Sequence, residues 1–194
     1  MDILDISSDN YLNIVRKTAE IVRKGGVVVF PTDTVYGLIV DATNKKAVEK
    51  IFRIKGREKR KWLPVFVKDL KLAKKIAKID KKQEKFLKSV WPGKTTVVLK
   101  RRKGMKLYGV DKDTIAIRTP DYPLLNKLLG RVNKPLVQTS ANISGKKPLN
   151  NAKDIIKQFK KAKLDLMISD NRLKFSKQSR LIDITGSQPK ILRE

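Results

Sequence analysis

The chain has 194 residues, of which 40% are hydrophobic and 6% are aromatic, which suits one domain with a mainly aliphatic core. It contains no cysteine and no histidine, which excludes disulfides, thiolate nucleophiles, imidazole bases and metal sites built on those side chains. Lys and Arg number 46 against 19 Asp and Glu, and the net charge of +27 indicates attraction to polyanions such as nucleic acid or nucleotides.

The charge does not identify a partner by itself. The basic residues are spread along the chain, and lysine-rich surfaces are general in thermophilic proteins. Contact with RNA is therefore compatible with the composition without being specified by it. No apolar run reaches membrane-spanning length, and the acidic start Met1–Asp5 does not resemble a signal peptide. We therefore expect a cytoplasmic protein without a membrane partner.

Helices and strands alternate in the first half of the chain. Apolar residues at helical spacing between Leu12 and Val22 predict a helix over 10–24. Val27–Phe30 is a short apolar run typical of a buried strand. The next predicted elements are a helix capped by Asn44 and ended by Gly56, a strand over 63–67, and two helices that start at Asp69 and Asp80 and end near Val90.

The second half continues the alternation with shorter elements. It predicts strands over 95–99 and 114–117, a helix over 124–129, a strand over 135–138, a loop over 140–151, a helix over 152–161 and strands over 164–168, 181–184 and 190–192. This order of elements predicts one mixed α/β sheet with helices on its faces.

Polar side chains follow the first predicted strand. The stretch 31–37 reads Pro-Thr-Asp-Thr-Val-Tyr-Gly. In open α/β sheets, ligands bind beyond strand ends, and the two threonine hydroxyls can donate and accept hydrogen bonds to a small polar substrate. The same residue types also form ordinary turns, so the stretch alone supports both interpretations.

Three further clusters combine cations or small polar residues. Lys55 and Arg57 can straddle a polyphosphate, although the helix dipole also favours cations at a helix C-terminus. Arg118 ends a predicted strand, where it either pairs with an acidic neighbour or clamps a carboxylate or phosphate. The stretch 139–145 can cradle a phosphate or form a polar loop.

One motif is rejected. Gly93, Lys94 and Thr95 look like the end of a phosphate-binding P-loop, but the pattern needs a glycine at position 88, which is Lys88. The pattern also needs a strand before it and a helix after it. Here a helix is predicted before and a strand after.

Six short motifs, taken in order, resemble the YrdC/TsaC family of threonylcarbamoyl-AMP synthases in its short, single-domain form. They lie at 31–38, 55–57, 91–93, 117–120, 140–145 and 191–193. Each motif is weak, but the ordered set is specific and covers nearly the whole chain. The resemblance implies a single domain over 1–194 with a twisted α/β fold and a deep, positively charged concavity.

The resemblance also implies an activity. L-Threonine, bicarbonate or carbon dioxide, and ATP would give threonylcarbamoyl-AMP and pyrophosphate, which makes the protein a nucleotidyltransferase. The product would feed a downstream tRNA threonylcarbamoyl-transferase complex that modifies the adenosine beside the anticodon. Mg²⁺ is expected as a cofactor held mainly by the ATP phosphates, because no carboxylate cluster in the sequence would bind it unaided.

The resemblance assigns residues to each substrate. Thr32, Arg118 and Ser179 match positions that hold threonine. The positions that hold ATP are Lys55, Arg57, Thr114, Ser140, Asn142 and Arg193, with Lys55 and Arg57 as the catalytic pair on the phosphates. A site without histidine suits this reaction, since a carbamate is already an oxyanion and its attack needs alignment and charge neutralisation.

Several positions depart from the family pattern. Phe66 stands where many members have histidine, Lys94 replaces a proline, Arg180 replaces a threonine, and 169–171 lacks a pair of glycines. These changes keep open an alternative, a non-catalytic paralogue that binds double-stranded RNA or tRNA. A second alternative is a role like that of the related domain in hydrogenase maturation, whose larger context carries zinc-binding cysteines and an acylphosphatase module; this chain of 194 residues without cysteine has neither.

Overall fold

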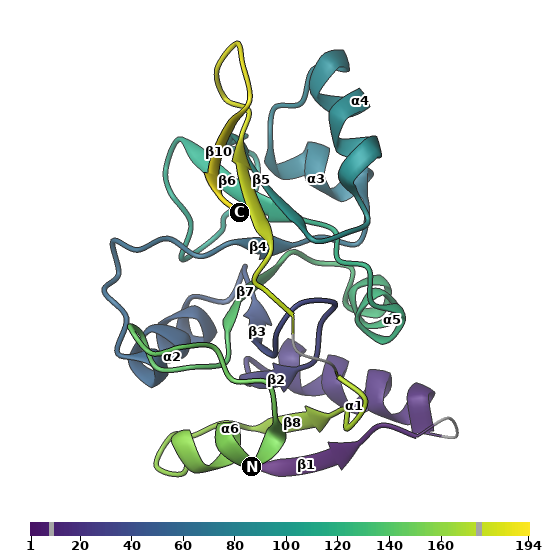
Figure 1. The fold of residues 1–194 in the computed structure, drawn as a ribbon, viewed down its shortest axis with the longest axis vertical. Coiled ribbons are helices and arrows are strands. Elements are labelled where there is room, and N and C mark those ends of the chain that lie inside the picture. The colour runs from purple at the N-terminus through teal and green to yellow at the C-terminus, as the bar shows by residue number, and fades with distance from the viewer. Residues whose placement is uncertain (8–9, 174–175) are drawn as a thin grey trace.

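A computed structural model describes residues 1–7, 10–173 and 176–194. Ten strands in these residues join one sheet in the order β1-β8-β2-β3-β7-β4-β6-β5-β9-β10 (Figure 1). The strands are β1 (Asp2–Asp5), β2 (Val28–Phe30), β3 (Gly37–Asp41), β4 (Val65–Phe66), β5 (Thr95–Lys100), β6 (Thr114–Arg118), β7 (Leu136–Ser140), β8 (Leu166–Ser169), β9 (Arg180–Asp183) and β10 (Lys190–Arg193). The helices are α1 (Tyr11–Arg23), α2 (Lys45–Lys55), α3 (Leu70–Ile76), α4 (Lys81–Val90), α5 (Pro123–Val132) and α6 (Ala152–Gln158).

The sheet is mixed, as the sequence predicts. The pairs β1–β8, β8–β2, β4–β6 and β5–β9 are parallel, whereas β2–β3, β3–β7, β4–β7, β5–β6 and β9–β10 are antiparallel. Helices cover both faces, with α1 and α5 on one side of the sheet and α2 and α6 on the other (Figure 1).

The strands place alternate side chains into two hydrophobic cores. In β2, Val29 joins the core under α2, while Val28 and Phe30 join the core under α1 and α5. In β8, Met167 and Ile168 divide in the same way. This period of two, with apolar side chains on both faces, explains why the strands read as continuous apolar runs in the sequence.

Local signals for helix ends are confirmed. Asn44, Asp69 and Asp80 each accept a hydrogen bond from the backbone amide three residues later, which is the N-cap interaction. Gly56 ends α2 in the left-handed conformation, with φ of 59°, which glycine adopts without steric cost. The P-loop interpretation is correctly rejected, because α4 precedes Gly93 and β5 follows it.

Other sequence predictions need correction. Leu12 is 77% exposed, and the buried face of α1 instead includes Ile14 and Thr18. The helix predicted over 152–161 ends at Gln158. The sequence pattern does not predict β1, which is short and largely exposed, or β3, which begins inside the polar stretch at Gly37.

No helix among the described residues combines the length and apolar character needed to cross a membrane.

Candidate functional site

The polar stretch after β2 forms a tight, buried turn. Thr32 Oγ1 donates to the Val35 carbonyl at 2.8 Å and accepts from the Thr34 amide at 3.0 Å. The turn interpretation of this stretch is confirmed, since Thr32 shapes the turn that carries Thr34 and Asp33, and substrate binding by the stretch stays a prediction. The register of β3 on β7 then places Gly37 opposite Ser140, so two of the predicted motifs are neighbours in the sheet.

Arg118 is held by a buried network. Its Nη2 forms an ion pair with Asp33 at 2.5 Å, and both side chains are almost fully buried, at 1% and 6% exposure. Nη1 donates to Thr34 Oγ1 at 3.1 Å and Nε to the Gly93 carbonyl at 2.8 Å. An acidic partner, one of the two possibilities for Arg118, is therefore present. Arginine has five N–H donors, and these contacts use three of them.

Lys55 lies inside the protein instead of on its surface. It is 1% exposed, and its Nζ donates to the carbonyl oxygens of Ser140 and Asn142. The Ser144 amide returns a hydrogen bond to the Lys55 carbonyl. Burial, and to a lesser extent the charge of Arg57, lower the pKa of Lys55 from its ordinary value to about 7. Lys55 thus links the end of α2 to the 140–146 loop.

The lowered pKa of Lys55 gives a signed prediction. The unfolded chain binds this proton up to the ordinary lysine value near pH 10.5, whereas the folded protein releases it at about 7. Between these values the unfolded state holds more protons, so the contribution of Lys55 to the free energy of unfolding should rise with pH across this window and be flat below it. Chemical denaturation at several pH values checks this against Lys55→Met, which should lack this rise. If the free energy of unfolding has the same pH dependence in the wild-type protein and in Lys55→Met, the lowered pKa of Lys55 is contradicted.

A small polar cavity of about 170 Å³ gathers many of the predicted residues. The predicted site residues that line it are Arg57, Arg118, Ser140, Ser179 and Arg193, and they are joined by Thr34, Gln138 and Gln178. Arg193 is oriented by the segment before β9, since its Nε donates to the Ser179 carbonyl at 3.0 Å and its Nη1 to Gln178 Oε1 at 2.8 Å. Three guanidinium groups thus surround one space.

A second cavity of about 280 Å³ is more apolar and shares part of this wall. Arg57, Pro64 and Arg193 line both cavities. The second adds Thr114, the half-exposed Trp62 and apolar side chains that include Leu63, Val98, Val110 and Leu181. Thr114 is fixed at the wall because its Oγ1 donates to Asp111 Oδ1 at 3.1 Å.

Three predicted site residues lie behind these walls instead of lining them. They are Thr32, Lys55 and Asn142, and all are buried. Asn142 uses its amide nitrogen on the Ile143 and Lys146 carbonyls, while its Oδ1 is buried without a partner among the described residues. The deep positive concavity remains a prediction, since the structure gives two small adjacent cavities.

The departures from the family pattern have different surroundings. Phe66 is buried in the core under α1 and α5, with the Arg118 guanidinium 5.8 Å from its ring centre. Asp170 accepts from Tyr122 Oη at 2.6 Å, and its amide donates to Tyr36 Oη at 2.8 Å. Arg180 is at the surface, paired with the exposed Glu194. Asp170 therefore ties its loop to the motif that contains Tyr36.

Sequence reasoning missed some contributors. Asp33 lies inside the 31–37 motif and pairs with Arg118, and Trp62 lies five residues after Arg57 and lines the apolar cavity. Thr96 was also missed; it is buried, with its Oγ1 2.8 Å from Ser179 Oγ. A carboxylate in a buried polar motif could have suggested the partner of Arg118. Nothing local in the sequence links Thr96 to Ser179.

Residues 20–194 match the family model named for Sua5, YciO and YrdC proteins, which carries the description "telomere recombination". The chain belongs to the Sua5/YciO/YrdC family. The family resemblance drawn from the six motifs is therefore confirmed.

Two relatives in this family carry the synthase name. A Methanocaldococcus jannaschii protein, named provisionally as a threonylcarbamoyl-AMP synthase, is 37% identical over 183 residues, which cover 92% of this chain and 86% of the relative. The threonylcarbamoyl-AMP synthase of Pyrococcus abyssi is 33% identical over 181 residues, covering 92% of this chain and 53% of that protein. The chain thus spans about half the length of the P. abyssi relative.

Solved structures in the family have the same fold. P. abyssi Sua5 in complex with L-threonine matches with a TM-score of 0.90 at 31% identity, over 100% of this chain and 57% of that one. Escherichia coli YciO, a protein named as uncharacterized, matches with a TM-score of 0.87 at 28% identity, over 100% of this chain and 94% of that one. The twisted α/β fold expected for the family is confirmed.

Proposed function

We propose that this protein joins L-threonine, bicarbonate or carbon dioxide, and ATP into threonylcarbamoyl-AMP, with release of pyrophosphate, as a single domain over residues 1–194. The observation that carries the proposal is the pair of adjacent cavities with Arg57 and Arg193 in their common wall. A polar cavity suits an amino acid and an apolar one suits a nucleobase. Arginines between them suit the phosphates that connect the two. The synthase names of two relatives support the same reading.

The threonine side is proposed to be the polar cavity. Arg118 retains two N–H donors beyond its internal contacts, and these can bind the threonine carboxylate. Thr32 would act through the turn that carries Thr34, and Ser179 through its hydroxyl beside Thr96. The P. abyssi relative has been solved with L-threonine, which supports this choice of ligand.

The nucleotide side is proposed to be the apolar cavity and the common wall. Its residues would be Lys55, Arg57, Thr114, Ser140, Asn142 and Arg193. Arg57 would neutralise phosphate charge directly. Lys55, whose Nζ donates to two backbone carbonyls, would hold the loop of Ser140 and Asn142 and, in its protonated form, supply positive charge. The unpartnered Asn142 Oδ1 can accept a hydrogen bond from a ligand or from water.

The chemistry needs no histidine. The amine of threonine first captures carbon dioxide and releases a proton to solvent, and a carbamate oxygen then attacks the α-phosphorus of ATP. One P–O bond forms and the bond to pyrophosphate breaks. Fixed cations that neutralise the developing charge and align the two substrates account for most of the rate enhancement in phosphoryl-type transfers. The arginines around the two cavities can supply this field.

Mg²⁺ is proposed to enter with ATP. The described residues contain no cluster of three or more acidic, histidine or cysteine side chains suited to a metal. Mg²⁺ commonly binds substrate phosphates with few protein ligands and several waters, so this donor set fits an ion carried on the triphosphate. We further propose a cytoplasmic protein whose product passes to a tRNA threonylcarbamoyl-transferase complex.

Pyrophosphate release by the purified protein tests the proposal. We expect release that requires ATP, L-threonine and bicarbonate together, and a mass spectrum that contains threonylcarbamoyl-AMP. The similarity to E. coli YciO, which has no assigned activity in its name, keeps one alternative, a non-catalytic paralogue that binds double-stranded RNA or tRNA. Absent turnover combined with intact binding of RNA would favour that alternative.

Thr32→Val should raise the KM for threonine more than the KM for ATP. The valine keeps the shape but cannot donate to the Val35 carbonyl or accept from the Thr34 amide. The turn that positions Thr34 and Asp33 would loosen, while the apolar cavity would be untouched. Steady-state kinetics with each substrate varied in turn measure both constants. The reverse pattern would move Thr32 to the nucleotide side.

Trp62→Ala should raise the KM for ATP by about 5- to 150-fold, with little change for threonine. The indole is 49% exposed at the rim of the apolar cavity, and stacking of one base on an aromatic ring is worth about 1–3 kcal/mol. Trp62→Phe should restore most of the affinity, because it keeps an aromatic surface. An equal increase of the KM for ATP in Trp62→Ala and Trp62→Phe would argue against stacking of the base on the indole.

A further inference from the structure

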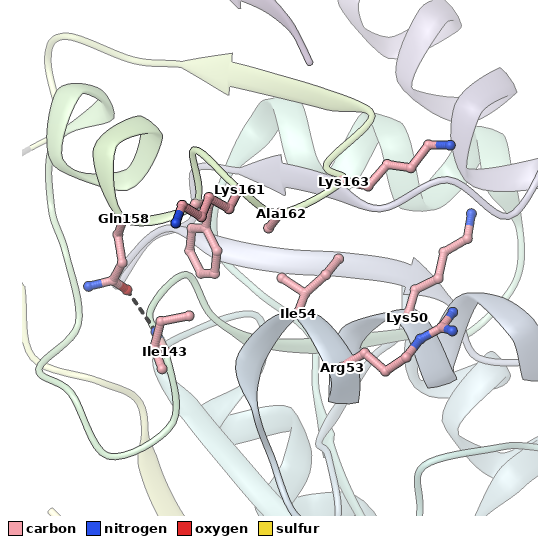
Figure 2. Close-up of a pocket in the computed structure, with 9 residues that line it drawn as sticks. Lys50, Arg53, Ile54, Ile143, Gln158, Lys161, Ala162 and Lys163 are labelled. Carbon is pink, nitrogen blue, oxygen red and sulfur yellow. Dashed lines mark hydrogen bonds between the residues drawn. The ribbon is translucent and has the colours of Figure 1, made fainter.

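A third cavity, of about 550 Å³, lies away from the candidate site, between α2, the loop after β7 and the end of α6 (Figure 2). Its apolar surface comes from Ile54, Ile143, Phe159 and Ala162. The residues that line it are all absent from the two cavities described above. It is therefore a separate feature, independent of the proposed synthase activity.

Cations gather on one side of this cavity. The side chains of Lys50, Arg53 and Lys163 lie together there, while Lys161 lies across the cavity beside Gln158 (Figure 2). Lys50 Nζ donates to the Gly25 carbonyl at 3.0 Å. Within residues 1–7, 10–173 and 176–194, none of these four cations forms an ion pair with a carboxylate.

The opposite side offers a positioned amide. Gln158 Oε1 accepts a hydrogen bond from the Ile143 amide at 2.7 Å (Figure 2). This contact fixes the side chain and leaves its NH₂ group free of protein partners in the described part of the chain. The cavity thus presents three cations on one side and an apolar surface next to them, whereas the Gln158 NH₂ group points away from the apolar surface (Figure 2).

We propose that this cavity is a second ligand site that binds a free nucleoside monophosphate. The phosphate would lie between Lys50, Arg53 and Lys163, since a dianion is best bound by several charged donors. The base would cover the apolar surface of Ile54, Ile143, Phe159 and Ala162. The volume falls within the range of about 300–1,000 Å³ that small-molecule sites occupy.

The arrangement of charge favours a free nucleotide over a nucleic-acid strand. Each internal sugar of a strand carries a phosphate at both its 5′ and its 3′ oxygen, whereas three of the four cations here form one group on one side, which suits a single terminal phosphate (Figure 2). The loop that contributes Ile143 also supplies the carbonyl oxygens that hold Lys55. A nucleotide in this cavity would therefore contact, from the other side, the loop that borders the candidate site.

Titration calorimetry with AMP on the full chain tests the proposal. An Arg57→Ala background weakens binding at the proposed nucleotide site, so we expect one AMP per chain to remain. Adding Arg53→Gln and Lys163→Gln should weaken the affinity for that AMP by about tenfold or more. Lys82→Gln with Lys85→Gln, two exposed positions on α4, removes the same charge elsewhere and should have little effect. If Arg57 has no role in nucleotide binding, a second AMP will remain bound in every variant. This outcome distinguishes an error about the nucleotide site at Arg57 from an error about the cavity proposed here.

A volume change tests the apolar part. Ala162→Leu partly fills the cavity without changing its charge. It should weaken the binding of AMP and leave the binding of inorganic phosphate unchanged. Any of three results would overturn the proposal. The first is an affinity for AMP that the Arg53→Gln/Lys163→Gln pair does not change, and the second is an equal loss of affinity in the Lys82→Gln/Lys85→Gln pair. The third is tighter binding of inorganic phosphate, or of a short RNA oligonucleotide, than of AMP in this cavity.

Discussion

Arg118→Ala is expected to lower the free energy of unfolding by about 3–5 kcal/mol, because it leaves a buried charge on Asp33 without its partner. The ion pair is almost completely buried, at 1% and 6% exposure. Among the partners in the described part of the chain, Asp33 would keep only the Asp121 amide, which donates to its Oδ2 at 3.0 Å. Thr34 and the Gly93 carbonyl would lose their contacts with the guanidinium as well. Urea denaturation of both proteins measures the difference.

Two controls separate the buried charge from the loss of a side chain. The double variant Asp33→Ala/Arg118→Ala removes both charges and should be more stable than Arg118→Ala alone. Arg180→Ala removes an arginine whose partner Glu194 is exposed, with the pair at 45% and 73% exposure, and should cost about 1 kcal/mol or less. A loss for Arg118→Ala no larger than that of Arg180→Ala would refute the buried-pair explanation.

Arg57→Ala is expected to lower turnover at least about tenfold, which corresponds to about 1.4 kcal/mol of barrier. Arg57 lines both candidate cavities, and its Nε and Nη2 donate to the carbonyl oxygens of Lys61 and Trp62. These contacts orient the guanidinium before any substrate binds. Lysine cannot reproduce this two-point orientation, so Arg57→Lys should recover only part of the activity. Pyrophosphate release at saturating substrates measures the effect.

Lys55→Ala should lower turnover by at least as much, but through two causes. It removes positive charge and also frees the Ser140 and Asn142 carbonyls from their donor, so its thermal stability should fall, whereas that of Arg57→Ala should change little. Arg60→Ala is the matched control, because Arg60 lies three residues beyond Arg57 with its side chain 84% exposed. Wild-type rates in both Lys55→Ala and Arg57→Ala would rule out the phosphate assignment.

Sequence reasoning performed best where the deciding interactions are local. The caps at Asn44, Asp69 and Asp80 span three residues each, and the left-handed turn at Gly56 depends on one residue. The alternation of elements predicted the mixed sheet for the same reason, since side-chain periodicity reports the local backbone. The missed strand β3 is different, because its pairing with β2 and β7 involves residues as far away as Ser140.

The same distinction between local patterns and long-range contacts applies to the candidate site. The sequence by itself determined the family, through six ordered motifs, and the types of residue available, which exclude histidine and cysteine chemistry. Only the tertiary structure decided what those residues do. It paired Arg118 with Asp33, 85 positions earlier, and it buried Lys55 under a loop that begins 85 residues later. Such contacts are set by how strands and loops pack across the sheet, and no local pattern in the sequence encodes that geometry.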